Sequence, residues 1–391
     1  MLPQTAGTGA SLAPMVRCGT LPLRLLALEY GAASVYSEET IAQALAETTR
    51  HAREDGYVDF VSKSGSTVLR TLPRVERAQL VVQLGAASAV HALAAAELVA
   101  HDCAGVDVNM GCPKPFSTTG GMGAALLKDP ERAADIVRTL ARNLPVPVSC
   151  KVRLLDDARA TLDFVRAMEH AGASCIAVHA RRADDREKAV AARWEALRPV
   201  VEAVGVPVLA NGDLYTWDDI ERVRRDSGCA GVLLARPALL NPSIFRGREC
   251  GPLPLRDVIA AYLRNCERHG AHYVTSKYTV IEMMRASRHP RRALDIARRD
   301  RSLDGIEIAN VSPLKSVGEL AALFPCAADD DGAAWPSDPA ATDDALALPR
   351  RGAARDAPAE DPAPAKRPRH LEPADGGSAA STPGDATCAL D

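Results

Sequence analysis

The sequence lacks paired cysteines: its ten cysteines are scattered along 391 residues, with no CxxC pair. Small secreted domains depend on dense, paired cysteines, so this pattern argues against that class and favours a reducing compartment. The first ten residues hold no basic start followed by an apolar run, and no apolar stretch reaches the about 18 residues of a membrane span. We therefore expect a soluble, cytoplasmic, monomeric protein with no membrane segment and no metal site.

Aromatic residues are also scarce, at 4% of the chain, although 47% of the residues are hydrophobic. A chain of this length and apolar content can bury a sizeable core. Its length suits an α/β barrel of roughly 250 residues with additional segments.

Charge is distributed unevenly along the chain, although the net charge is only -3. Residues 327–391 carry a net charge of -7, whereas residues 241–326 carry +5. A basic flank beside a nearly neutral body fits a polyanionic partner such as nucleic acid. A solvated helical face would give the same excess of charge, so charge alone does not decide between the two.

Short apolar runs alternate with helical patterns from about residue 11 to 240. Strands that are apolar throughout and separated by amphipathic helices indicate a parallel sheet covered on both faces. Eight such units favour a closed TIM (β/α)8 barrel, which we assign to residues 11–250. The expected strands are Leu12–Met15, Ser34–Tyr36, Leu80–Leu84, Gly105–Asn109, Val146–Val152, Cys175–Val178, Val206–Ala210 and Ala230–Leu234. The expected helices include Val90–Ala100, Pro130–Arg142, Ala158–Ala171, Trp194–Val204 and Trp217–Asp226.

Other segments depart from this alternation. Residues 58–61 and 67–70 flank Ser64–Ser66 and predict a small hairpin inserted before the third strand. Residues 251–326 predict a small all-helical domain, with helices over Leu255–His269, Tyr273–Ser287, Arg291–Arg301 and Pro313–Phe324. We expect residues 1–10 to be flexible. Residues 327–391, rich in Ala, Asp, Pro and Gly, are expected to form a disordered tail.

Polar residues stand at the carboxyl ends of most predicted strands, where barrels of this kind place their functional groups. One such residue means little, but seven strand ends in register on one face indicate a site. These ends are Ala13–Val16, Gln83–Gly85, Asn109–Lys114, Lys151–Arg153, His179–Arg181, Asn211–Asp213 and Ala235–Arg236.

The last two strand ends predict a phosphate site. Gly212 and the small Ala235 let backbone N–H groups approach an anion, and Arg236 adds a fixed positive charge. The loops after strands seven and eight are the usual phosphate site of this fold. Outside a barrel, the same residues would be an ordinary turn glycine and a surface arginine.

The segment Asn109–Leu127, with the sequence NMGCPKPFSTTGGMGAALL, resembles the signature of the tRNA-dihydrouridine synthases. Residues Ala13–Arg17, Gly19–Pro22 and Asn241–Phe245 are similar to the eukaryotic branch that reduces uridine 20 of the D-loop. The resemblance runs in order from about residue 11 to 285 and is more specific than any single motif.

This resemblance implies an FMN-binding barrel that is reduced by NADPH or NADH and that binds tRNA together with the helical domain. It implies Cys112 as the catalytic acid, Asn109 as a uracil contact, Arg153 as a further substrate-binding residue, and a mobile lid at Gly120–Gly123. The implied flavin contacts are Pro14, Met15, Val16, Gln83, Lys151, His179, Asn211, Gly212, Asp213, Ala235 and Arg236. Basic residues of the helical domain, among them Arg285, Arg298 and Arg299, would follow the tRNA phosphates.

The implied chemistry is consistent with these residue types. A hydride from N5 of the reduced flavin adds to C6 of uracil, and a proton must reach C5 from the opposite face. A thiol with a pKa of about 8.5 is protonated at neutral pH and can still give up its proton. Cys112 should therefore remain a thiol, and Lys151 would stabilise negative charge on the flavin.

Two alternatives remain open at this point. One is an FMN barrel oxidoreductase acting on a small molecule, which would lack the Asn109–Leu127 signature and the basic helices. The other is a tRNA-binding protein without catalysis, against which the intact Cys112, Lys151 and His179 argue. Animal members of this branch carry a double-stranded-RNA-binding domain after the helical domain. We expect residues 327–391 not to fold into one, which places more of the binding on the helical domain. Lys366–Arg369 resembles a short nuclear-localisation signal, so a nuclear population is a further possibility.

Overall fold

The computed structural model describes residues 9–185, 190–287 and 300–325. The predicted helix over 291–301 lies almost entirely outside these residues. Arg298, Arg299 and the tail over 327–391 lie outside them completely.

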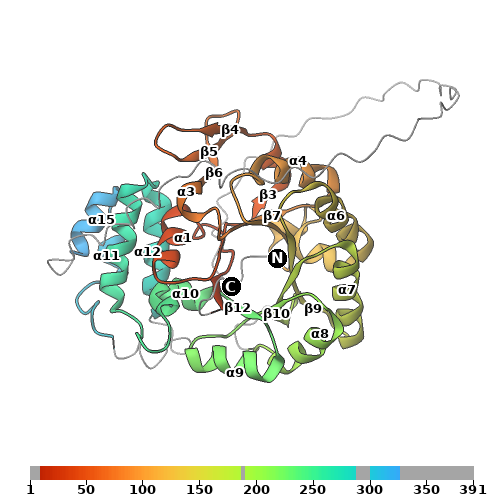
Figure 1. The fold of residues 1–391 in the computed structure, drawn as a ribbon. Coiled ribbons are helices and arrows are strands. Elements are labelled where there is room, and N and C mark those ends of the chain that lie inside the picture. Colours follow the sequence, from red (N-terminus) through yellow and green to blue (C-terminus); the bar gives the residue numbers. More distant parts are fainter. Residues whose placement is uncertain (1–8, 186–189, 288–299, 326–391) are drawn as a thin grey trace, which may run out of the picture. The chain divides into compact units, whose positions relative to one another are not determined.

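Eight parallel strands form a closed ring, as predicted (Figure 1). Seven successive pairings run from β2 through β1 and β12 to β7, and a further pairing of β2 with β7 closes the sheet. In that closing pair, Val35 lies opposite Leu80 and Tyr36 opposite Val81. The strands are β1 (Ala10–Leu12), β2 (Val35–Tyr36), β7 (Leu80–Gly85), β8 (Gly105–Met110), β9 (Val148–Leu154), β10 (Cys175–Arg182), β11 (Val208–Asn211) and β12 (Gly231–Leu234).

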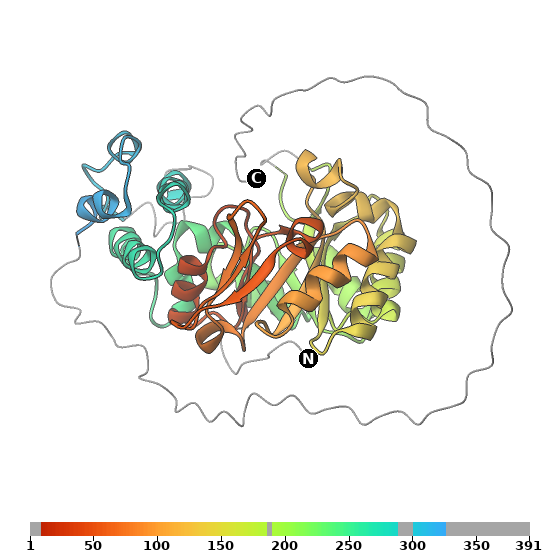
Figure 2. The same cartoon turned by 90° about the horizontal axis from the view of Figure 1, so that it is seen from above.

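Helices cover the outside of the ring, and Figure 2 shows them packed along its wall. They are α1 (Leu21–Glu29), α2 (Ala42–Ala46), α4 (Ala89–Val99), α6 (Pro130–Asn143), α7 (Ala158–Ala171), α8 (Leu197–Ala203), α9 (Trp217–Ser227) and α10 (Arg236–Leu240). Short 3-10 turns lie at η1 (Gly123–Lys128), η2 (Trp194–Ala196) and η3 (Pro242–Arg246).

Local sequence signals explain where the clearest of these helices begin and end. The Asp157 carboxylate accepts two backbone N–H groups at the start of α7, and Gly172 ends the helix in a left-handed conformation. Thr216 and Asp219 form a reciprocal capping box at the start of α9. The helices predicted over these two segments are confirmed within one residue.

The first strand differs from the prediction. β1 spans Ala10–Leu12, whereas Leu12–Met15 was expected, and Ala10 is buried although it was assigned to the flexible N-terminus. Pro14 has no N–H group to donate to a neighbouring strand, so pairing stops at Ala13, whose N–H bonds to Leu234 O. The chain then turns, with the N–H groups of Cys18 and Gly19 both bonding to Met15 O.

The second barrel strand is interrupted. After β2 the chain bulges through residues 37–39 and then resumes pairing with β7 as β3 (Thr40–Ile41). Thr40 follows Val35 by five positions, but their partners Leu80 and Leu84 are only four positions apart. The extra residue bends the strand and turns Glu39 toward the barrel mouth, as bulges at barrel rims do.

The predicted hairpin is confirmed but is one strand larger. β5 (Val58–Val61) and β6 (Thr67–Thr71) pair antiparallel, and β4 (Thr49–Ala52) adds to the other side of β5. β4 is exposed at all four residues, so it lacks the apolar alternation that would reveal a strand. The short α3 (Pro73–Glu76) returns the chain to the barrel.

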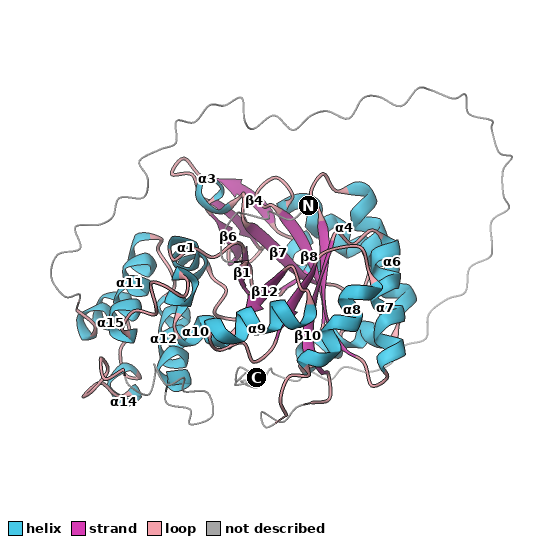
Figure 3. Cartoon of the chain, turned by 60° about the horizontal axis from the view of Figure 1, so that its bottom comes forward, coloured by secondary structure: helices cyan, strands magenta, loops and turns pink. Residues whose placement is uncertain are grey.

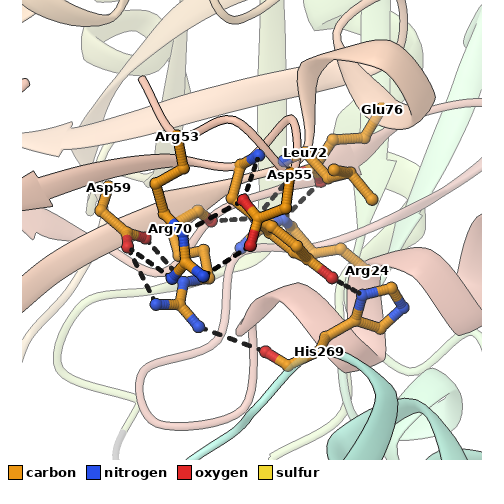
Figure 4. A network of polar contacts seen from close by, with 9 residues as sticks. Arg24, Arg53, Asp55, Asp59, Arg70, Leu72, Glu76 and His269 are labelled. Atoms are coloured by element: carbon orange, nitrogen blue, oxygen red, sulfur yellow. Dashed lines mark hydrogen bonds and ion pairs between the residues drawn. The ribbon is translucent and has the colours of Figure 1, made fainter. Parts of the chain in front are cut away.

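A polar network ties this three-stranded insert to the barrel and to α11 (Figure 4). Arg24 of α1 forms a buried bidentate ion pair with Glu76 at 2.8 Å and donates to Arg70 O in β6. Arg70 pairs with Asp59 and donates to His269 O at 3.2 Å. The insert is therefore anchored on two sides.

Residues 255–325 contain helices only, within the part that the structure describes (Figure 3). They are α11 (Leu255–Arg268), α12 (Tyr273–Ser287), α14 (Ile308–Val311) and α15 (Val317–Leu323). α12 has the predicted bounds, but α15 begins four residues later than predicted because Ser316 caps it by accepting from Glu319 N. α11 packs against α1, and α12 packs against α10. Among the described helices, none combines the length and the apolarity needed to cross a membrane.

Candidate active site

The predicted strand ends meet at one mouth of the barrel. Across neighbouring strands, Asn109 lies opposite Lys151, and His179 lies opposite both Arg153 and Asn211. Since all eight strands are parallel, their carboxyl ends share this rim. The sequence prediction that these polar side chains come together is confirmed in position.

Four cations surround His179 at this mouth. Burial, together with the charges of Arg153, Lys151, Arg181 and Arg236, lowers the pKa of His179 well below its usual value, so the imidazole is neutral. Its Nδ1 is buried and has no hydrogen-bond partner among the described residues. Buried polar atoms are almost always paired, so this nitrogen suits a bound ligand.

Lys151 is one of these cations and comes from β9. Burial, followed by the charge of Arg153, lowers the pKa of Lys151 to about 8. Its ammonium group is therefore protonated at neutral pH but destabilised. An anion bound beside it would be strongly favoured.

The predicted phosphate residues lie beside His179. Gly212 has a φ of +113°, and a side chain there would bring a Cβ within 3.0 Å of His179 Cδ2. Asp213 also has a positive φ, and its carboxylate accepts from Arg236 at 2.9 Å and from Arg181. Its side chain therefore holds the two guanidinium groups in place. Although burial acts to raise it, hydrogen bonding and the charge of Arg181 hold the pKa of Asp213 below its usual value.

The loop after β8 carries Cys112. Asn109 Oδ1 accepts from Gly111 N at 2.9 Å and from Cys112 N at 3.1 Å, which fixes the turn. Both roles fall on the amide oxygen, so the Asn109 Nδ2 group is the one left to donate. Arg153 Nε donates to Gly111 O at 2.8 Å, which braces the same loop from β9.

The loop is packed tightly below Cys112. Ala124 N donates to Cys112 O at 2.9 Å. Gly123 has a φ of +58°, and a Cβ there would lie 2.4 Å from Ser117 Oγ and 2.5 Å from Cys112 O. No other residue fits at position 123 without displacing Cys112.

Cys112 is half-buried, and its thiol is held in the protonated form. Burial, followed by the charge of Glu39, raises the pKa of Cys112 to about 11. This direction is the one expected for an acid and opposite to that of a cysteine nucleophile. The eight cysteines that the structure describes are all free thiols.

Sequence comparison identifies the family. The model of the family described as "Dihydrouridine synthase (Dus)" matches residues 11–302.

The chain belongs to the dihydrouridine synthase family.

Curated relatives agree with this assignment. The chain is 38% identical over 286 residues to a tRNA-dihydrouridine(20) synthase [NAD(P)+] of Schizosaccharomyces pombe, covering 71% of this chain and 59% of that protein. It is 34% identical to a Saccharomyces cerevisiae protein of the same name, covering 60% of this chain and 65% of that protein. A human protein named tRNA-dihydrouridine(20a/20b) synthase [NAD(P)+]-like is 32% identical, and the match covers 62% of this chain and 72% of that protein. The chain thus spans about 59–65% of the length of the two yeast relatives.

Two residues of this site, Asp107 and Glu39, were not among those predicted from the carboxyl ends of the strands. Asp107 is fully buried one layer below the rim, where it accepts from Gln83 Nε2 at 2.8 Å and from Ser149 Oγ at 2.6 Å. Burial raises its pKa to about 6. A carboxylate inside the apolar run Gly105–Met110 was the available signal. Glu39 lies between β2 and β3, at the one barrel strand whose end contributed no residue to the predicted site.

The remaining predicted contacts lie after β1, before α10 and in α12. Met15 is buried after β1, with Pro14 and Val16 half-buried on either side. Ala235 directly precedes α10, with Leu239 N bonding to its carbonyl. Arg285, a predicted tRNA contact, lies in the last turn of α12 and pairs with Glu282 at 2.8 Å. No group of three or more potential metal ligands occurs within the described ranges.

Proposed function

We propose that this protein is a flavin-dependent tRNA-dihydrouridine synthase that reduces the C5–C6 bond of a D-loop uridine, at position 20. The observation that carries this proposal is a neutral His179 beside four cations, whose Nδ1 has no hydrogen-bond partner among the described residues, at the same barrel mouth as a protonated Cys112. Relatives whose names specify position 20 and NAD(P)+ support the choice of substrate and of electron donor.

The residues of the mouth fit FMN. Arg181 and Arg236, held by Asp213, supply two fixed positive charges for a phosphate, and Gly212 leaves room for its close approach. Gln83 is oriented through Asp107: because its Nε2 donates to that carboxylate, its Oε1 remains available as an acceptor. When bound, FMN supplies the hydride that reduces the uracil ring.

Lys151 stabilises negative charge at the centre of the site. Its pKa of about 8 keeps it cationic at neutral pH, and a nearby anion would raise that pKa. It lies opposite Asn109 in the register of β8 and β9. Asn109 and Lys151 therefore approach a bound base from neighbouring strands.

Cys112 gives the proton that completes the reduction. As hydride reaches C6, negative charge develops toward C5 and O4 of uracil, and the thiol proton transfers to C5. The raised pKa of Cys112 ensures that this proton is present at neutral pH. The resulting thiolate then takes up a proton from solvent before the next turnover.

The substrate base must leave its stack to reach this mouth. Extruding a base costs least in a loop, where it has no pairing partner to lose, and this suits a D-loop uridine. The basic segment 241–326, with a net charge of +5, would hold the surrounding phosphates.

The decisive experiment is incubation of the purified protein with unmodified tRNA, FMN and NADPH, followed by mapping of dihydrouridine by mass spectrometry. We expect product at position 20. Cys112→Ala should reduce product formation by at least about 100-fold, since general acid catalysis contributes that much, while bound flavin remains unchanged.

Cys250→Ala is the matched control, because Cys250 is exposed and should leave activity unaltered. Dihydrouridine formed at the wild-type rate by Cys112→Ala would remove the assigned acid. A protein that binds no flavin would contradict the proposal, as would one that binds tRNA but yields no dihydrouridine.

A further inference from the structure

Glu39 occupies the barrel mouth because of the bulge in the second strand. Its carboxylate lies against the end of β7, where a Cβ on Gly85 would come within 2.6 Å of Glu39 Oε1. A glycine at position 85 is therefore needed for this carboxylate to enter the mouth.

One carboxylate oxygen of Glu39 anchors the loop that carries Cys112. Ser117 Oγ donates to Glu39 Oε1 at 2.9 Å, across a separation of 78 positions in the sequence. Ser117 is buried and lies directly against Gly123 and the Cys112 backbone. Glu39 thus contacts the centre of the loop and not its edge.

The other oxygen, Oε2, is buried and has no hydrogen-bond partner among the described residues. Burial raises the pKa of Glu39 above its usual value. The side chains of Ser117, Asn109 and Cys112 face this carboxylate and act in the opposite direction, lowering that pKa. A buried carboxylate that is only half satisfied is costly, so its retention beside a thiol calls for a functional reason.

The charges that face Cys112 come from two sides. Glu39 stands on the side of the second strand, and Lys151 and Arg153 stand on β9. The backbone N–H of Lys114 also contacts the sulfur. The two cations favour a thiolate, whereas Glu39 opposes it.

We infer that Glu39 is a positioning residue whose carboxylate adds to burial in favouring the thiol form of Cys112 beside two cations and anchors its loop through Ser117. Lys151 and Arg153 act against burial and favour the thiolate, which has no proton to give. Glu39 offsets them, and after proton transfer it disfavours the thiolate and speeds reprotonation. This inference rests on the proposed role of Cys112 as the acid.

The test measures the thiol itself, so that its failure is distinct from a failure of the proposed function. The alkylation rate of Cys112 by iodoacetamide is followed between about pH 7 and 11, with the Cys112 peptide quantified by mass spectrometry in the flavin-loaded protein. Glu39→Gln keeps an acceptor for Ser117 but removes the charge. We expect its alkylation midpoint to fall by about one pH unit, which is about tenfold more thiolate at a given pH below the midpoint.

Ser117→Ala is the matched control, because it removes the hydrogen bond but keeps the charge, and it should leave the midpoint unchanged. An equal midpoint in Glu39→Gln and the wild type would overturn the inference. If Glu39→Gln fails to retain flavin, Glu39→Asp replaces it. That variant draws the carboxylate back from the sulfur and should lower the midpoint by a smaller amount, so an unchanged midpoint there would also overturn the inference.

Discussion

At the scale of single residues, buried carboxylates organise this site. Asp107 is completely buried and fixes the orientation of Gln83, yet it forms no ion pair within the part of the chain that the structure describes. Its pKa of about 6 means that the folded protein disfavours the ionised form. Ionised Asp107 therefore lowers the stability of the folded protein, while its carboxylate holds Gln83 in one orientation.

Asp107→Asn should stabilise the protein above pH 6. The carboxyl group binds its proton more tightly in the folded state, so its ionisation costs stability as the pH rises from about 4 to 6, and the full cost is present above that range. We expect an increase of about 1–3 kcal/mol in the unfolding free energy at pH 8, measured by denaturant titration at equal flavin content. The gain should vanish near pH 4.

Asp135→Asn on α6 provides the control, since Asp135 is exposed and its replacement should change stability little at either pH. Flavin affinity should fall in Asp107→Asn, because the amide at position 107 no longer fixes the Gln83 orientation. A variant less stable than the wild type at pH 8 would contradict this account.

At the scale of elements, the insert β4–β6 contacts the end of α11 through His269. The Tyr57 hydroxyl hydrogen-bonds with His269 Nδ1 at 2.8 Å, and Arg70 donates to the carbonyl of the same histidine. His269 Nε2 is buried without a partner among the described residues. Burial, followed by the charges of Arg268, Arg74 and Arg70, lowers the pKa of His269 to about 4.

Acid should therefore weaken this contact. His269 binds a proton more weakly in the folded state, so its contribution to stability is complete above about pH 6.5 and is lost as the pH falls toward 4. In His269→Gln, which cannot titrate, the loss of unfolding free energy over this range should be smaller by about 1–2 kcal/mol. Denaturant titrations at several pH values measure the difference.

His91→Gln on α4 is the control, because His91 is exposed and its replacement should leave the pH dependence as in the wild type. An identical loss of stability in His269→Gln and the wild type would show that this histidine does not control the docking of the insert.

At the scale of the whole molecule, we expect the proposed binding of tRNA to depend on basic residues of segment 241–326 and not on those of the barrel mouth. The mouth of the barrel holds four cations around His179, whereas most of the basic excess lies in residues 241–326. Cofactor binding and tRNA binding should therefore be separable by mutation.

Arg298→Glu with Arg299→Glu should weaken tRNA binding while flavin content stays intact. Losing two phosphate contacts should reduce the slope of log affinity against log salt by about 2. Fluorescence anisotropy with labelled tRNA at several salt concentrations measures this change. The control pair, Arg138→Glu with Arg142→Glu, lies on exposed positions of α6. Affinity at low salt that matches the wild type would refute the role of the first pair.

The sequence by itself determined the architecture of the barrel. Apolar runs with intervening helical periodicity specified eight parallel strands, and the caps of α7 and α9 specified helix ends within one residue. These are local features: a strand or a helix is encoded within about ten residues, and parallel order follows from the connecting helices. The residues Asn109, Lys151 and His179 were predictable for the same reason, because each follows directly from its own strand end.

Only the tertiary structure decided what these residues contact. The pairing of β2 with β7 and the bulge at residues 37–39 place Glu39 against Ser117, and no local pattern encodes a contact across 78 positions. Asp213 was predicted from its strand end as a cofactor contact, but only the fold shows that its carboxylate accepts from Arg181 and Arg236. Protonation states were likewise decided by the fold, because burial and neighbouring charge set them, and both depend on chain segments that meet only after folding.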